Sequence, residues 1–67
     1  MEISARNQLK GRVKEVVLGT VMAEVVVDVG GQEVAAAITR RSAEGLGLKT
    51  GDAVTVIIKA TAVMIGK

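Results

Sequence analysis

The sequence contains no cysteine, histidine, proline or aromatic residue. Without cysteine, neither a disulfide nor a thiolate metal site can form. Without histidine, the chain lacks the commonest transition-metal ligand and the commonest general base, so Ser–His and Cys–His nucleophiles cannot be built. Without aromatic rings, it lacks the platforms on which single-stranded nucleic acids stack. These absences argue against an enzyme and against a nucleic-acid-binding module.

Charge and hydropathy indicate a small cytoplasmic protein with neither nucleic acid nor membrane as a partner. Nine basic and seven acidic residues give a net charge of +2, and the two signs are interleaved instead of forming a basic stripe. No apolar run approaches the roughly 20 residues of a membrane span. The first ten residues carry three charges and no apolar stretch, so we expect no signal peptide.

The chain length predicts one domain over residues 1–67 that associates with copies of itself. A chain of this size buries only about 60% of the surface that its unfolded form exposes, so its own core stabilises it weakly. Apolar residues nevertheless make up 49% of the sequence. Small folds without disulfides or structural metals are commonly stabilised by association, and we therefore expect a homo-oligomer.

Alternation of apolar and polar residues, which is typical of half-buried strands, dominates the chain. It predicts five strands, over residues 9–18, 20–29, 32–39, 53–59 and 61–65. Gly30-Gly31 predicts a hairpin, and residues 49–52 predict a turn. A helical turn is expected to begin near Thr39 and to be stopped by glycines, with Leu46 and Leu48 closing one end of the core. The predicted fold is all-β: a small five-stranded OB-like Greek-key barrel with one short helical turn between strands 3 and 4.

Three polar features could form a binding site. Ser4-Ala5-Arg6-Asn7 precedes the first strand. Thr39 and Ser42 flank the expected helix start, where they are either an ordinary N-cap or a pair of hydroxyl ligands for an anion. Lys59 ends the fourth strand, where it either binds an anion or guards a sheet edge against aggregation.

The acidic residues are distributed as on a solvated surface, and an acid–base pair among them is the weaker interpretation. The candidates are Glu15, Glu24, Asp28, Glu33, Glu44 and Asp52.

Four blocks of the sequence together are similar to the molbindins, the Mop family of molybdate- and tungstate-binding proteins. The blocks are Ser-Ala-Arg-Asn-Gln from Ser4, Gly-Thr-Val-Met-Ala-Glu-Val from Gly19, Ile-Thr-x-x-Ser from Ile38, and Lys-Ala-Thr-x-Val-Met-Ile from Lys59. Their order and spacing match the family over essentially the whole chain. The family also occurs as tandem modules in molybdate-responsive regulators and at the end of molybdate-transporter ATPases. With neither partner attached here, the resemblance implies a free-standing form that stores or buffers molybdenum.

The resemblance further implies a homohexamer, assembled as a trimer of dimers, that binds molybdate or tungstate between subunits without an organic cofactor and without direct metal coordination by side chains. Carried over by position, the main oxyanion-binding residues are Ser4, Ala5, Arg6, Thr39, Ser42, Lys59 and Ala60. The family often has serine at position 60, so alanine there removes one hydroxyl. A second anion site near the trimer axis would use Gly19, Thr20 and Val21. An OB-type nucleic-acid-binding module and a purely structural oligomerisation module are the alternatives.

Overall fold

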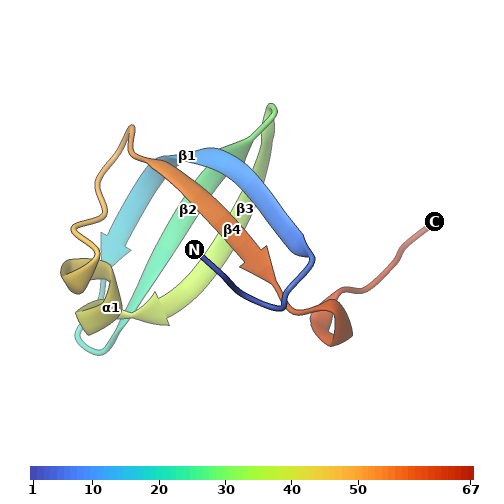
Figure 1. Cartoon of the computed structure of the whole chain (residues 1–67). Coiled ribbons are helices and arrows are strands. Elements are labelled where there is room, and N and C mark those ends of the chain that lie inside the picture. Colours follow the sequence, from blue (N-terminus) through green and yellow to red (C-terminus); the bar gives the residue numbers. More distant parts are fainter.

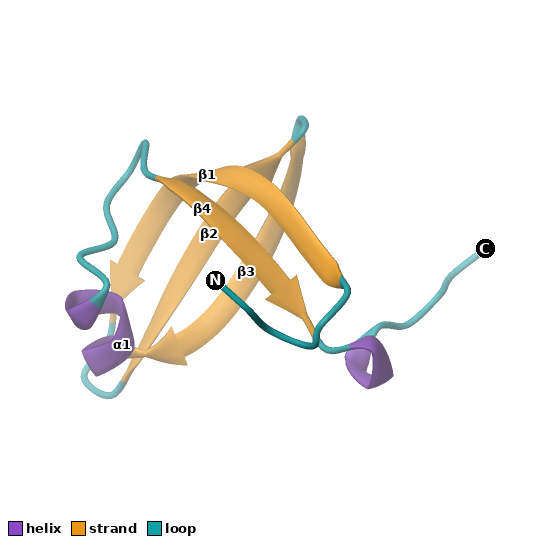
Figure 2. Ribbon diagram, in the orientation of Figure 1, coloured by secondary structure: helices purple, strands orange, loops and turns teal.

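A curved antiparallel sheet of four strands forms the body of the protein (Figures 1 and 2). The computed structural model describes residues 1–67. The elements in chain order are β1 (Asn7–Leu18), β2 (Met22–Val29), β3 (Gln32–Thr39), α1 (Arg40–Gly45), β4 (Ala53–Ile58) and a 3-10 turn, η1 (Ala60–Ala62). No helix in the chain is long and apolar enough to cross a membrane.

The strand order β3-β2-β1-β4 is that of a Greek key, since three strands follow one another through hairpins and the fourth returns beside the first. β1 is the strand that joins the two parts of the sheet. Its first half pairs with β4, from Asn7 opposite Ile58 to Arg12 opposite Ala53. Its second half pairs with β2 and ends with Leu18 opposite Ala23. The two ends of β1 therefore lie next to different segments of the chain.

The core lies on the concave face and consists mainly of valine. Val13, Val25 and Val27 are buried together, and Leu48 packs against them from the loop before β4. The predicted alternation in β2 and β3 is confirmed, because β2 buries alternate residues and β3 half-buries alternate residues. The expectation that Leu46 also closes the core is wrong. Leu46 directly follows the last residue of α1 and remains 71% exposed.

A β-bulge changes the phase of β1. Val13 pairs with Val27 and Glu15 pairs with Val26, so one residue of β1 has no partner in the register. The unbroken alternation that the sequence suggested from Leu9 to Leu18 therefore breaks at this point. After Val13, the next residue of β1 to turn inward is Val16. The bulge bends the strand, which lets a single strand serve both halves of the sheet.

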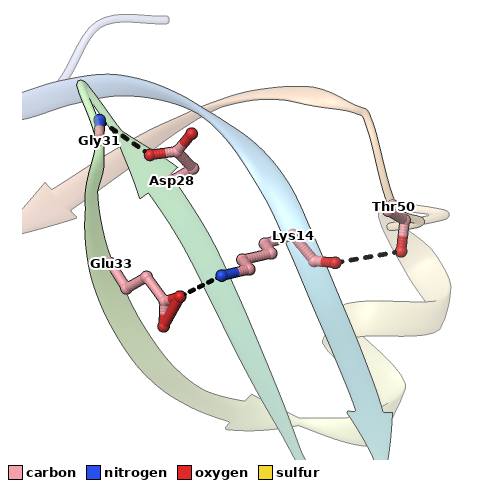
Figure 3. Close-up of polar contacts among 5 residues, drawn as sticks. All are labelled: Lys14, Asp28, Gly31, Glu33 and Thr50. Atoms are coloured by element: carbon pink, nitrogen blue, oxygen red, sulfur yellow. Dashed lines mark hydrogen bonds and ion pairs between the residues drawn. The ribbon is translucent and has the colours of Figure 1, made fainter.

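The predicted hairpin at Gly30-Gly31 is confirmed. Val29 pairs with Gln32, so the loop has two residues, and both glycines have positive φ (58° and 87°) as a tight hairpin of this kind requires. The Asp28 carboxylate accepts a 2.9 Å hydrogen bond from the Gly31 amide (Figure 3).

The prediction of a fifth strand over residues 61–65 is wrong. Residues 60–62 form the 3-10 turn, and the segment after it runs away from the sheet (Figure 1). Met64 and Ile65 are each 91% exposed. A strand needs a neighbour to pair its backbone groups, and the tail lies beside no sheet edge of its own chain. The fold within one chain is thus an open four-stranded sheet and not a closed five-stranded barrel.

Gly11 allows β1 to cross β2 closely. A Cβ atom at this position would lie 2.5 Å from the Asp28 carbonyl oxygen and 2.7 Å from a Val27 methyl group. We expect Gly11→Ala to lower the free energy of unfolding by about 1–3 kcal/mol, the usual cost of overpacking. Gly45→Ala is the control, because no atom outside its chain neighbours and its own helix backbone lies within 4 Å of its Cβ position. Urea denaturation of both variants measures the effect, and equal midpoints would contradict this account.

Candidate functional site

A hollow of about 420 Å³ lies where the chain enters β1 and leaves β4. Asn7 pairs with Ile58 at the end of the β1–β4 ladder, so the residues before Asn7 and after Ile58 meet there. The Asn7 side-chain amide donates a 3.2 Å hydrogen bond to the Ile58 carbonyl, which fixes this corner. We call this feature the cationic hollow; it is lined by Ser4, Ala5, Arg6, Lys59, Ala60 and Thr61.

The cationic hollow presents positive charge and free donors. The two ion pairs of the structure, Lys14–Glu33 and Arg40–Glu44, involve neither Arg6 nor Lys59, so both cations lack an acidic partner. The first hydrogen bonds of η1 start from the amides of residues 62 and 63, and the Ala60 and Thr61 amides donate to no group of the chain. Two cations and free N–H groups around one hollow suit an anion with several oxygen atoms.

A second pocket, of about 500 Å³, lies at the start of α1. We call it the helix-start pocket; it is lined by Thr20, Val21, Thr39, Arg40, Arg41 and Glu44. The expected strand start at Thr20 is wrong, because the segment 19–21 turns and the Gly19 amide bonds the Met22 carbonyl at 2.7 Å. The Gly19 and Val21 carbonyls accept hydrogen bonds from the Arg40 guanidinium (3.2 Å) and the Arg40 amide (2.8 Å). Arg41 takes part in no ion pair.

Thr39 is the N-cap of α1, as one of the two interpretations of this residue predicted. Its hydroxyl oxygen accepts a 3.0 Å hydrogen bond from the Ser42 amide, and its hydroxyl donates to the Ser42 oxygen at 2.8 Å. The two hydroxyls therefore bind one another within the chain. Their predicted part in anion binding stays a prediction.

The structure brings together some of the predicted site residues and separates others. Ser4, Ala5, Arg6, Lys59 and Ala60 share the cationic hollow. Thr39 instead pairs with Met22 across β2 and β3 and lies with Thr20 and Val21 in the helix-start pocket. These two regions are next to opposite ends of β1 (Figure 1), so one chain does not assemble the whole set.

Two features of the site were missed from the sequence. Thr61 lines the cationic hollow but was assigned to a fifth strand, and its position two residues after Lys59 was the signal available. Arg40 and Arg41 are not among the site residues predicted from the sequence, although both line the helix-start pocket.

Several acidic residues have structural roles. Glu33 accepts a hydrogen bond from Lys14 (Figure 3), and this bond and the carboxylate charge raise the pKa of Lys14. Asp28 and Asp52 accept backbone hydrogen bonds in turns. No group of three acidic, histidine or cysteine residues is placed to hold a metal ion. The residues that line the cationic hollow are cations, hydroxyls and backbone donors, which suit an anion.

Comparison with known proteins shows the family to which this chain belongs. The model of the TOBE domain family matches residues 3–65. Molybdenum-pterin-binding protein 3 of Clostridium pasteurianum is 53% identical over 97% of each chain. A molybdate-binding protein from Sporomusa ovata superposes with a TM-score of 0.95 at 51% identity, over the whole of both chains. The molybdate-bound structure of the cytoplasmic molybdate-binding protein ModG has a TM-score of 0.85 at 44% identity and covers 90% of this chain and 43% of its own.

The fold is that of a small TOBE domain. Within that family, the chain belongs to the Mop proteins, so the resemblance found in the sequence is confirmed.

The N-cap role of Thr39 can be tested separately from any ligand. We expect Thr39→Ala to lower the free energy of unfolding by about 1 kcal/mol, because the Ser42 amide loses its acceptor. Thr39→Ser should retain most of the stability. Thr20→Ala is the control, because the Thr20 hydroxyl makes no hydrogen bond and lines the same pocket. Chemical denaturation in ligand-free buffer measures all three variants. An unchanged free energy of unfolding in Thr39→Ala would contradict the N-cap assignment.

Proposed function

We propose that this protein reversibly binds molybdate or tungstate and that the cationic hollow carries the main contacts. The observation behind the proposal is the meeting of Arg6 and Lys59, without any acidic partner, beside the hydroxyls and free amides of the same hollow. Tetrahedral oxyanions carry two negative charges and four acceptor oxygens. The cations supply the attraction, and the directional N–H and O–H groups supply the geometry.

The ligand is a bare oxyanion in this proposal, although some relatives are named for a molybdenum–pterin compound. A pterin is a flat ring system that proteins usually hold between aromatic or large apolar groups. The hollow contains only small and polar residues apart from the stems of Arg6 and Lys59, and the chain has no aromatic ring. The structural neighbours that bind molybdate also support the oxyanion.

We further propose that the anion lies between subunits of a homo-oligomer, a trimer of dimers as the family resemblance implies. Thr39 and Ser42 lie at the opposite end of β1 from the hollow, so they can reach an anion held by Arg6 and Lys59 only from another copy. The second anion site that we propose would use Gly19, Thr20 and Val21. Thr20 and Val21 line the same pocket as Arg41, whose unpaired guanidinium supports an anion there.

Apolar surface that the single chain leaves uncovered supports association. An apolar groove of about 240 Å³ is lined by nine apolar side chains from β2, β3, β4 and the loop after α1. The exposed apolar residues of the C-terminal tail, Met64 and Ile65, have no surface of their own chain to cover. A second copy that placed its tail on the groove would bury both surfaces and would give β3 or β4 a pairing partner.

Storage, buffering or homeostasis of molybdenum in the cytoplasm is the role that fits such a protein. A reversible binding site without a general base or a nucleophile holds and releases its ligand unchanged, so we propose no enzymatic reaction. The cytoplasmic location of ModG supports the same compartment.

Calorimetric titration tests the proposed ligand. Molybdate and tungstate should bind far more tightly than sulfate, because donors spaced for a larger anion reach a smaller one poorly. Arg6→Ala and Lys59→Ala should each weaken molybdate binding about ten- to a hundredfold, the loss expected for one hydrogen bond to a charged partner. Molybdate should also raise the melting temperature of the wild type more than that of either variant.

Lys14→Ala is the matched control for these charge variants. It removes one positive charge from an exposed ion pair with Glu33, away from the hollow, and such pairs contribute little to stability. Its affinity should equal that of the wild type. Equal heats for sulfate and molybdate would refute the ligand, and wild-type affinity in Lys59→Ala would reduce Lys59 to a guard of the sheet edge.

Association through the tail has its own test. We expect an oligomer at micromolar concentration and a marked shift toward smaller species in the Met64→Asp/Ile65→Asp double variant, because charged groups are costly to bury in an apolar groove. Lys67→Asp introduces an acid at the end of the same tail and should leave the assembly intact. Light scattering with native mass spectrometry measures the masses. A folded wild-type monomer would exclude the oligomer. An unchanged assembly mass in the double variant would exclude the tail contact.

A further inference from the structure

The hydroxyl groups of the chain differ in what they already bind. Thr39 and Ser42 bind each other, and Thr50 donates to the Lys14 carbonyl at 3.4 Å. Thr20 lines the helix-start pocket, and Thr55 lies within β4. Only Ser4 and Thr61 combine a hydroxyl without a partner in the chain with a place in the cationic hollow. Of these two, Thr61 comes from the same chain segment as Lys59.

We infer that Thr61 is a specificity-determining residue for the oxyanion, because its unpartnered hydroxyl lines the cationic hollow beside Lys59. This inference rests on the proposed function. Attraction by Arg6 and Lys59 depends on the charge of the anion, which molybdate and sulfate share, so the cations alone discriminate weakly. A hydroxyl is directional and reaches only an oxygen at the right distance from the centre of the anion.

The position and chemistry of Thr61 suit this task. Residue 61 is the middle residue of η1, whose turn is closed by hydrogen bonds from the amides of residues 62 and 63 to the carbonyls of residues 59 and 60 (2.9 and 3.3 Å). These bonds fix the backbone of Thr61 relative to Lys59. A β-branched side chain has few rotamers, so the hydroxyl also loses little freedom when it binds. Ser4 belongs to the N-terminal segment, where no such turn fixes the backbone.

The inference predicts separate effects on affinity and on selectivity. Thr61→Val keeps the shape of the side chain and removes its hydroxyl. It should weaken molybdate binding about ten- to a hundredfold, the expected loss for a hydrogen bond to a charged partner. It should weaken sulfate binding less, so that the ratio of the two affinities falls. Thr61→Ser restores a hydroxyl and should return affinity to within a few-fold of the wild type.

Titration of the assembled protein with molybdate and with sulfate tests the inference, with Thr50→Val as the control. Thr50 lies in the turn before β4, outside the hollow, the helix-start pocket and the apolar groove, and its hydroxyl makes only a 3.4 Å hydrogen bond to the Lys14 carbonyl, so the same substitution there should leave both affinities unchanged. Light scattering on each variant checks that the assembly persists. If Thr61→Val dissociates or unfolds, the comparison of Thr61→Ala with Thr61→Ser replaces it, and the same loss and rescue are expected.

The outcomes separate this inference from the proposed function. Wild-type protein that binds no molybdate would overturn both. Wild-type protein that binds molybdate while Thr61→Val keeps the same affinity and the same selectivity would overturn only the role of Thr61. An equal loss of affinity for molybdate and for sulfate in Thr61→Val, without rescue in Thr61→Ser, would show a structural role. That result would also overturn the inferred role of Thr61 in specificity.

Discussion

The shared pairing of β1 is the constraint on which the rest of the structure depends. One strand of twelve residues forms a ladder with β4 along its first half and with β2 along its second half. It can do so only because Gly11 lets it pass close to β2 and because the bulge after Val13 bends it. The core valines are brought together by this arrangement, and each end of the strand places a different set of polar residues.

β1 also keeps two groups of polar residues apart, one near each of its ends. The hollow with Arg6 and Lys59 lies at the start of β1, and the pocket with Arg40 and Arg41 lies beyond its end. Keeping four cations in two groups limits their mutual repulsion within one chain. Association would bring the groups of different copies together, and a dianion between them would then compensate the repulsion. Ligand binding and assembly are in this way expected to favour each other.

The sequence was sufficient for features that depend on local patterns. Alternation located the four strands, Gly30-Gly31 located the hairpin, and Thr39 marked the start of α1. Features that depend on distant partners were not predictable in the same way. The sequence from Val13 to Val16 does not reveal the bulge, because its apolar and charged residues are compatible with the register with a bulge and with the register without one. The tail has the composition of a strand, but whether it forms one depends on a neighbour that its own chain does not provide. Likewise, only the register shows that Thr39 and Lys59 lie near opposite ends of β1, and only the folded chain shows that Thr61 lines the cationic hollow.

The Gly30-Gly31 hairpin has a practical consequence. Its tip lies two residues beyond Asp28, which pairs with Arg12 in the middle of β1, and so at neither end of β1. No atom lies within 4 Å of the Cβ position of either glycine. An inserted epitope or a short genetically encoded tether could leave the body at this loop without entering the hollow, the pocket or the apolar groove. The hairpin is therefore a natural attachment point for immobilising the protein as an anion sensor.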